Sequence, residues 1–224
     1  MANQKLKELL IDTMKFLGEK HKELANSAKS IAGDGSPERV VTAAKGTVYT
    51  DNQITLGVSQ WIKTTNGGNT GWKVLNGDTG WVEITKATTR KNNSNKVWIR
   101  RVNGRVTWKF GGGSFDWFGI VARSDANWRG LDKGGKIYHT YICPPNSNLI
   151  PVGFRSPNSL IGQFYSDLTN KAYGVWKLGG VNDRNQFRLE FFDQEDAKKA
   201  IDDIRFDTIT YLTDDPWPTT LTGW

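Results

Sequence analysis

The sequence predicts a mainly β protein with one α-helix at its N-terminal end, and three observations support this. Apolar residues recur at heptad spacing near the start of the chain. The chain contains 24 Gly and 10 Trp, and abundant Trp and Gly favour strands and tight turns over helices. Short apolar runs are separated by Gly, Asn and Pro. We expect a helical stalk at 1–35, a small β module at 40–88 and an antiparallel β-sandwich head, carrying one short helix, at 96–224.

The first element is a helix expected over residues 3–32. One set of apolar residues repeats every seven positions, and a second set follows the first by four, which is the spacing of a coiled-coil seam. A lone amphipathic helix must bury such a seam against its own domain or against copies of itself. No following helix offers a partner, which favours self-association, and GDGSP at 33–37 indicates a linker. The expected oligomerisation residues are Leu10, Met14, Leu17, Leu24, Ala28 and Ile31, with His21 as a poor seam residue.

The β module contains the same three residues twice, in the stretch NTGWKVLNGDTGW at 69–81. A two-residue type I′ turn at Asn76-Gly77 would place Trp72 directly opposite Trp81 as a cross-strand pair. We interpret the repeat mainly as a folding device. The alternative is that both rings are stacking platforms for sugars. A polar and basic stretch at 86–95 then indicates a second linker.

A second hairpin is expected at 97–110, VWIRRVNGRVTWKF, with its turn at Asn103-Gly104. Counting from this turn pairs Val97 with Phe110, Ile99 with Trp108 and Arg101 with Val106 on one mostly apolar face. From Lys86 to Lys109 there are eight basic and no acidic residues, so the positive charge of the chain is local and could contact an anionic polymer. A solvated linker is the alternative. The other face of the hairpin carries Trp98, Arg100, Val102, Arg105 and Lys109.

The remaining strands are short and regularly spaced, as in an antiparallel sandwich or barrel. One helix is expected among them, because Asp193 can cap QEDAKKAIDDI and Ala197, Ala200, Ile201 and Ile204 follow helical spacing. The expected strands lie at 116–122, 136–142, 160–165, 173–178, 186–192 and 204–212.

The sequence contains little that indicates catalysis, and we expect neither an enzyme nor a cofactor. Cys143 is the only cysteine, so no disulfide forms within the chain, and with only His21 and His139 a His-rich metal site is excluded. Residues four apart on a strand are too distant for His139 to activate Cys143. No apolar run is long enough for a membrane span, and MANQKLKELL is not a secretory signal. Acids that could flank a glycosidic bond, more simply read as surface residues at turns, are Asp125, Asp132, Asp167, Asp183 and Glu190.

Aromatic residues beside polar ones favour a saccharide site in the head. Trp117, Trp128 and Trp176 lie in the Gly-rich segments DWFG, DANWRG and GVWKLGG. Flat aromatic faces stack on the C–H faces of a sugar while polar neighbours bind its hydroxyls. Each Trp, and likewise His139, is alternatively a core residue. The expected saccharide-binding residues are Trp128, Asp125, Arg129, His139, Trp176, Trp117 and Arg155.

Three segments together resemble a known family. They are the short helix leading into a small β module, the module's GWKVLNGDTGWVEI, and RRVNGRVTWKF followed by NLIPVGFRSPNSLIGQFY and GVWKLGG. In these segments the chain resembles receptor-binding or baseplate tail-fibre proteins of siphophages that infect Gram-positive bacteria, of the lactococcal or Listeria type. Ser156 before Pro157 departs slightly from the turn of that pattern.

The resemblance implies a homotrimer that attaches through its N-terminal part to other phage baseplate or tail proteins. Its heads would bind host cell-wall polysaccharide, or a teichoic-acid-like glycan, without cleaving it. We therefore expect a virion protein of the tail tip, made in the host cytoplasm, with neither nucleic acid nor membrane as a partner. The alternative is a baseplate scaffold or adaptor whose aromatic residues make protein contacts. A cell-wall polysaccharide hydrolase is the third hypothesis.

Overall fold

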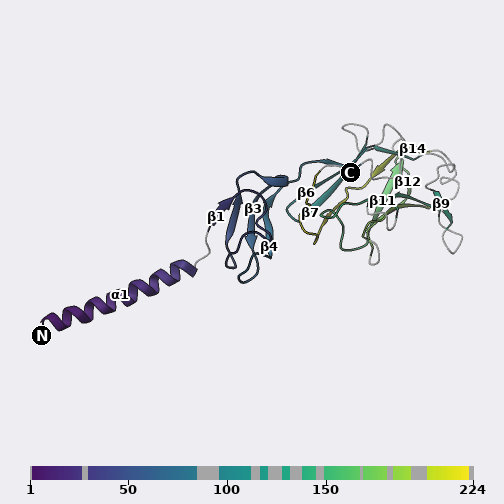
Figure 1. The fold of residues 1–224 in the computed structure, drawn as a ribbon. Coiled ribbons are helices and arrows are strands. Elements are labelled where there is room, and N and C mark those ends of the chain that lie inside the picture. Colours follow the sequence, from purple (N-terminus) through teal and green to yellow (C-terminus); the bar gives the residue numbers. More distant parts are fainter. Residues whose placement is uncertain are drawn as a thin grey trace. The chain divides into compact units, whose positions relative to one another are not determined.

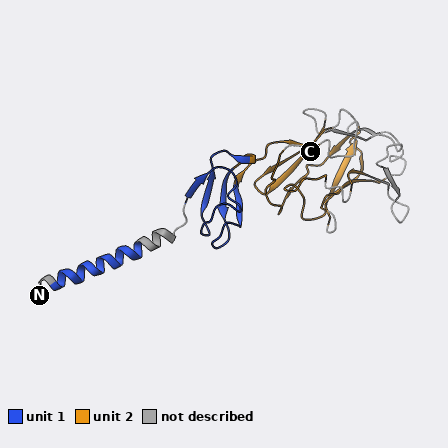
Figure 2. Cartoon of the chain, in the orientation of Figure 1, with its two compact units in different colours: residues 1–55, 59–75 blue, residues 56–58, 76–224 orange. Residues whose placement is uncertain are grey.

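The computed structural model describes residues 2–26, 30–84, 96–111, 117–120, 128–131, 138–144, 149–166, 169–180, 184–192 and 201–221. It confirms a mainly β chain with one N-terminal helix (Figure 1). The chain divides into two compact units (Figure 2). Unit 1 comprises residues 1–55 and 59–75, and unit 2 comprises residues 56–58 and 76–224.

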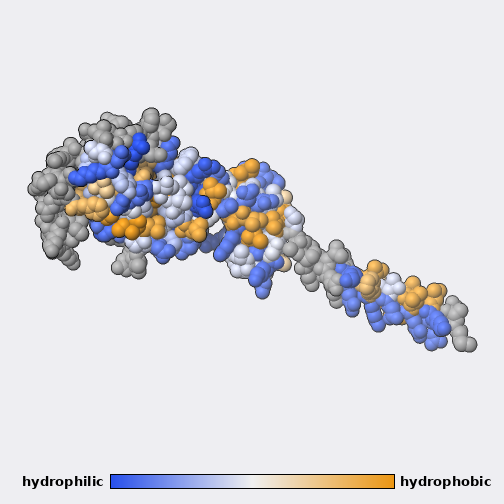
Figure 3. All heavy atoms as spheres, turned by 180° about the vertical axis from the view of Figure 1, so that it is seen from behind, coloured by the Kyte–Doolittle hydropathy of each residue, from blue (hydrophilic) through white to orange (hydrophobic). Residues whose placement is uncertain are grey.

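The helix α1 spans Ala2–Asn26. Its seam residues Leu10, Met14 and Leu17 are 62%, 67% and 59% exposed, so no described residue buries them. Figure 3 shows apolar residues gathered along one side of this helix. The expected helix was too long, because Ile31 lies on a strand and takes no part in a helical seam. Ala28 lies outside the described residues.

The rest of unit 1 is built on one four-stranded sheet of order β1-β2-β3-β4. β1 is parallel to β2, and β2 is antiparallel to β3. A short 3-10 helix, η1 (Thr55–Gly57), precedes β3. Alternation along the VYTD strand buries Tyr49 and Asp51 and leaves their neighbours half-buried. The strands are β1 (Ser30–Gly33), β2 (Val48–Asp51), β3 (Val58–Lys63) and β4 (Trp72–Gly77).

The expected linker at 33–37 is folded into this unit. The buried carboxylate of Asp51 accepts hydrogen bonds from the backbone N–H groups of Gly35, Gln53 and Thr55, at 2.9, 3.0 and 2.9 Å. Gly35 has a φ of 80°, which a residue with a side chain rarely adopts. Burial alone would raise the pKa of Asp51, but the backbone hydrogen bonds that its carboxylate accepts lower it below its ordinary value.

The hairpin predicted at Asn76-Gly77 is wrong. Both residues lie on β4, and neither has the positive φ that a type I′ turn requires. Trp72 is buried in unit 1, where its ring packs edge-on against Tyr49 at 5.9 Å. Trp81 belongs to unit 2 and is 45% exposed. The repeated Thr-Gly-Trp therefore forms no cross-strand pair.

Unit 2 contains two sheets. One has seven strands, in the order β8-β14-β11-β12-β13-β10-β9, and the other has the order β15-β7-β6-β5. The seven-stranded sheet is formed by β8 (Trp117–Ile120), β9 (Trp128–Leu131), β10 (Tyr138–Cys143), β11 (Leu160–Ser166), β12 (Ala172–Leu178), β13 (Phe187–Phe191) and β14 (Ile201–Phe206). The four-stranded sheet is formed by β5 (Val82–Glu83), β6 (Lys96–Val102), β7 (Arg105–Gly111) and β15 (Thr210–Leu212).

The second predicted hairpin is confirmed in its register. β6 and β7 pair Val97 with Phe110, Ile99 with Trp108 and Arg101 with Val106. All six side chains are buried. Asn103 at the turn has a φ of 51°, which is the left-handed conformation that a type I′ turn needs at its first central residue.

One hydrophobic core joins the two sheets of unit 2. Trp108 and Phe110 of β7 contact Phe187 of β13, with ring centroids 5.3 and 5.7 Å apart. Phe110 also meets Phe206 of β14 at 4.3 Å. The inward faces of two sheets that share such a core form a sandwich-like fold.

The short helix predicted at 193–204 is wrong where the structure describes it, since Ile201 and Ile204 lie on β14. Residues 193–200 lie outside the described residues. The strand expected at 204–212 is in fact two strands in different sheets. β14 pairs with β11 and β8, whereas β15 pairs with β7. The chain crosses from one sheet to the other at residues 207–209.

Candidate functional site

The outward side of the four-stranded sheet gathers tryptophan and basic side chains in contact with one another. Alternation sends Trp98 and Arg100 of β6 and Thr107 and Lys109 of β7 away from the core. Trp81 precedes the buried Val82 of β5, so it joins this outward side. We call this surface the aromatic–cationic face and define it as Trp81, Trp98, Arg100, Thr107 and Lys109.

Two cations flank the exposed ring of Trp81. The guanidinium of Arg100 lies 5.9 Å from its centroid and the ammonium of Lys109 lies 5.8 Å from it. Lys109 is also 5.0 Å from the ring of Trp98. The cations and indoles thus hold one another in place through cation–π contacts. These contacts favour one orientation of the partly exposed Trp81 ring.

Arg100 is anchored by a carboxylate. Its Nε donates to Oδ1 of Asp78 over 2.8 Å, and its Nη2 contacts Oδ2 of the same residue. The hydrogen bond from Arg100 lowers the pKa of Asp78, and the same bond raises the pKa of Arg100. Arg100 therefore contacts the Trp81 ring while the Asp78 carboxylate compensates much of the charge of Arg100. Lys109 is the less compensated cation of the face.

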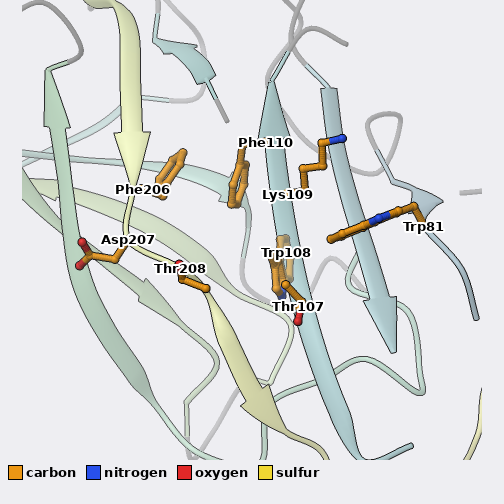
Figure 4. Close-up of a pocket in the computed structure, with 8 residues that line it drawn as sticks. All are labelled: Trp81, Thr107, Trp108, Lys109, Phe110, Phe206, Asp207 and Thr208. Atoms are coloured by element: carbon orange, nitrogen blue, oxygen red, sulfur yellow. The ribbon is translucent and has the colours of Figure 1, made fainter. Parts of the chain in front are cut away.

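A cleft of about 240 Å³ adjoins this face, where the chain crosses between the two sheets. Figure 4 shows Phe110 pointing towards Phe206 on one side of β7, and Lys109 pointing towards Trp81 on the other. The cleft forms here because β15 covers the edge of β7 only as far as the bond from Trp108 N–H to the Ile209 carbonyl. Its lining residues are Trp81, Thr107, Trp108, Lys109, Phe110, Phe206, Asp207 and Thr208.

The cleft combines apolar rings with groups of both charges and two hydroxyls. Asp207 is held in place because its Oδ2 accepts a hydrogen bond from the backbone N–H of Gln163 at 2.7 Å. The nearby Tyr165 hydroxyl donates to Oε1 of Gln163 at 2.6 Å, and burial together with the charge of Asp207 raises the pKa of this hydroxyl. Rings, hydroxyls, an ammonium and a carboxylate are the groups that bind a polyol or a sugar acid. In the described part of the chain, no three His, Cys, Asp or Glu side chains come together as metal ligands.

The residues predicted to bind saccharide are spread over the seven-stranded sheet. Trp128 and Arg129 are on the edge strand β9, next to β10, where His139 faces Gly130. Trp117 is on β8, the edge strand at the opposite side of the sheet. The structure thus brings His139 close to the strand of Trp128 and separates both from Trp117. Asp125 lies outside the described residues.

Two other predicted site residues, Trp176 and Arg155, make contacts that stabilise the fold. Trp176 is 5% exposed, packs edge-on against Phe187 and lies over Gly162 of the paired strand. This position leaves almost no ring surface for a ligand and matches the core alternative. Arg155 donates from Nε to the Ile150 carbonyl, and its backbone N–H donates to Asp215. Arg155 thus helps to fix the 150–156 loop.

Sequence reasoning placed Trp98 and Lys109 on one cationic face but did not include them in the saccharide site. The period-two alternation of the hairpin was a sufficient signal for these two residues. Trp81 was considered a sugar-stacking platform only as the alternative, because the Asn76-Gly77 pair assigned it to another hairpin as a folding device. Asp207 was missed because its segment was expected to be continuous strand.

No family model, curated protein or solved structure matches this chain. No helix among the described residues is long and apolar enough to cross a lipid bilayer.

Proposed function

We propose that this chain is a non-enzymatic receptor-binding protein of a bacteriophage tail that attaches to host cell-wall saccharide. The observation that carries the proposal is the half-exposed Trp81, whose ring lines a cleft and has Arg100 and Lys109 5.9 and 5.8 Å from its centroid. The resemblance of the helix, the module and the head segments to siphophage tail proteins supplies the biological setting.

The aromatic–cationic face suits a saccharide better than a flat protein surface. A pyranose ring presents C–H groups on its face and hydroxyls on its edge. Trp81 would stack on the former, while Thr107 and Asp207 would bind the latter. Lys109 would add attraction to a phosphate or carboxylate group of the wall polymer. We place the binding site here rather than around Trp176, whose ring is buried.

We further propose that α1 assembles the chain into a homotrimer. The exposed seam residues Leu10, Met14 and Leu17 support self-association, and the number three comes from the family resemblance. Binding by a few rings and hydrogen bonds gives modest affinity per site. Three sites engaging one polymer would supply avidity.

The test is binding of the full chain to purified host-wall polysaccharide, with Trp81→Ala compared with Phe192→Ala. Phe192 is an exposed aromatic residue of the same unit, 62% exposed, outside the cleft. We expect Trp81→Ala to weaken binding about threefold to tenfold per site. Phe192→Ala should bind like the parent. Equal binding by parent and Trp81→Ala would contradict the proposed site.

The same experiment separates the alternatives. A receptor-binding protein leaves the length of the polysaccharide unchanged, whereas a hydrolase shortens it. A baseplate scaffold or adaptor would associate through α1 but would not bind polysaccharide at any tested concentration. The only specific support for the scaffold or adaptor hypothesis is the exposed apolar seam of α1. This seam supports the receptor-binding hypothesis equally well.

A further inference from the structure

A buried lysine holds an exposed loop of unit 1 from within. Lys63 is 1% exposed, and its ammonium donates to the carbonyl oxygens of Gly67 and Thr70 at 2.7 and 2.6 Å. It also contacts the hydroxyl and carbonyl oxygens of Thr65, at 2.6 and 3.2 Å. Three ammonium hydrogens thus serve four oxygens, the longest contact being shared. We call these four oxygens the Lys63 cage.

The loop around the cage contains one of three Asn-Gly pairs in the sequence, Asn66-Gly67. Asn66 and Gly67 are both exposed. Gly67 has a φ of 60°, and a Cβ added there would meet no atom within 4 Å. No described residue accepts a hydrogen bond from the Gly67 N–H. The nitrogen of Gly67 is therefore open to reaction with the neighbouring side chain.

We propose that Asn66 is a site of spontaneous deamidation. The backbone nitrogen of Gly67 loses its proton and attacks Cγ of the Asn66 side chain. The new N–Cγ bond closes a succinimide ring, and the side-chain nitrogen leaves as ammonia. Water then opens either ring carbonyl and produces aspartate or isoaspartate. Glycine favours the reaction because no side chain shields the attacking nitrogen.

The other two Asn-Gly pairs are protected by each other. Gly77 N–H donates to Oδ1 of Asn103 at 2.8 Å, which engages the Asn76-Gly77 nucleophile. The same bond engages the side-chain carbonyl of Asn103. The backbone N–H of Asn103 in turn donates to the Gly77 carbonyl at 2.9 Å. Both pairs must open locally before they can react. The sequence alone does not separate the three pairs, and the structure does.

Deamidation at Asn66 has a structural consequence when it gives isoaspartate. Isoaspartate adds one atom to the backbone between residue 66 and Gly67. This insertion falls between the carbonyls of Thr65 and Gly67, both of which hold Lys63. The cage cannot keep both contacts at their present distances, and a buried ammonium that loses acceptors is costly. Aspartate leaves the backbone length unchanged and spares the cage.

The test is incubation of the full chain at mildly alkaline pH, followed by peptide mapping in a mass spectrometer. We expect conversion at Asn66 to be at least about fivefold faster than at Asn76 or Asn103, since their hydrogen bonds must first open. Asn66→Gln should not convert at this position. Equal rates at the three pairs, or a faster reaction at Asn76 or Asn103, would overturn the proposal.

The effect on the cage has its own readout. The aged chain, with isoaspartate at residue 66 quantified by enzymatic methylation, should melt at a lower temperature than fresh chain. Asn66→Asp should melt like the fresh parent, and Lys63→Met provides the reference for complete loss of the cage. An aged sample that is mostly isoaspartate and melts like fresh chain would overturn the structural consequence.

Discussion

The indole N–H of Trp108 donates a hydrogen bond to the hydroxyl of Tyr211 over 2.9 Å in the core of unit 2. The Tyr211 hydroxyl in turn donates to the carbonyl of Phe154. One buried hydroxyl therefore links β7, β15 and the 150–156 loop. Burial raises the pKa of Tyr211 above its ordinary value, so the hydroxyl keeps its proton and remains a donor.

We predict that Tyr211→Phe lowers the free energy of unfolding of unit 2 by about 1–3 kcal/mol, because it leaves two buried polar groups without their partner. Chemical denaturation measures this change. Thr210→Val is the control, since the exposed Thr210 hydroxyl pairs only with Thr107 across the strands. Its effect should stay within about 0.5 kcal/mol. A Tyr211→Phe variant as stable as the parent would show that the hydroxyl is dispensable.

Unit 1 should lose stability in acid through Asp51. The pKa of Asp51 is lowered in the folded chain from an ordinary value of 3.8. Its stabilising contribution is therefore fully present above that value and is lost as the pH falls through the lower, folded pKa. Asp51→Asn should weaken this acid dependence and destabilise unit 1 at neutral pH. Melting curves across pH test both effects, with the exposed Asp34→Asn as control. Identical acid dependence in parent and Asp51→Asn would exclude this carboxylate.

The two tryptophans of the repeated Thr-Gly-Trp should differ in their effect on stability. Trp72→Ala should destabilise by about 3–5 kcal/mol, because it removes a buried ring. It also removes the hydrogen bond from the indole to the Val41 carbonyl. Trp81→Ala should change stability by less than about 1 kcal/mol, since the side chain is half-exposed. The double variant should equal the sum of the single effects. Measured coupling between the two sites would contradict their assignment to separate units.

Binding to an anionic wall polymer should weaken as salt is added, because exposed charges are screened. Lys109→Gln should reduce both affinity and its salt dependence. Arg105→Gln should not, since Arg105 lies on the same strand beside the turn and outside the cleft. Adsorption measured over a series of salt concentrations distinguishes the two variants. If Lys109→Gln adsorbs like the parent at low salt, Lys109 does not contact the polymer.

Self-association should depend on the seam of α1. Replacing Leu10 and Leu17 together by Lys should reduce the mass measured by light scattering from three chains towards one. The control replaces Leu9 and Phe16 by Lys. These two residues are as exposed as Leu10 and Leu17 and are also one heptad apart, but they lie off the seam. Equal loss in both variants would indicate general apolar contact rather than a coiled coil.

Local patterns predicted the elements whose partners are close in sequence. The heptad spacing predicted α1, and the alternation around Asn103-Gly104 predicted the register of β6 and β7. The same dipeptide failed at Asn76-Gly77, because Gly77 bonds to Asn103 through both its N–H and its carbonyl. Contacts between distant segments thus overrode a strong local turn signal.

The candidate site was only partly predictable for the same reason. Trp98 and Lys109 share a face by simple strand alternation. Trp81 reaches that face, and Asp207 reaches the adjoining cleft, through pairings between distant parts of the chain, which no single-sequence pattern specifies. The sequence also did not predict that residues 201–212 form two strands in different sheets. A run of alternating residues does not show where the chain passes from one sheet to another.

The pairing of β15 with β7 has a consequence for biosynthesis. Thr107 and Thr210 are 103 residues apart, so the edge of β7 stays open while the ribosome makes the intervening chain. At typical rates this takes roughly 5–20 s. An uncovered edge strand can pair with other nascent chains during that time. A message truncated shortly before residue 210 would leave the edge of β7 without β15, so we expect its product to aggregate.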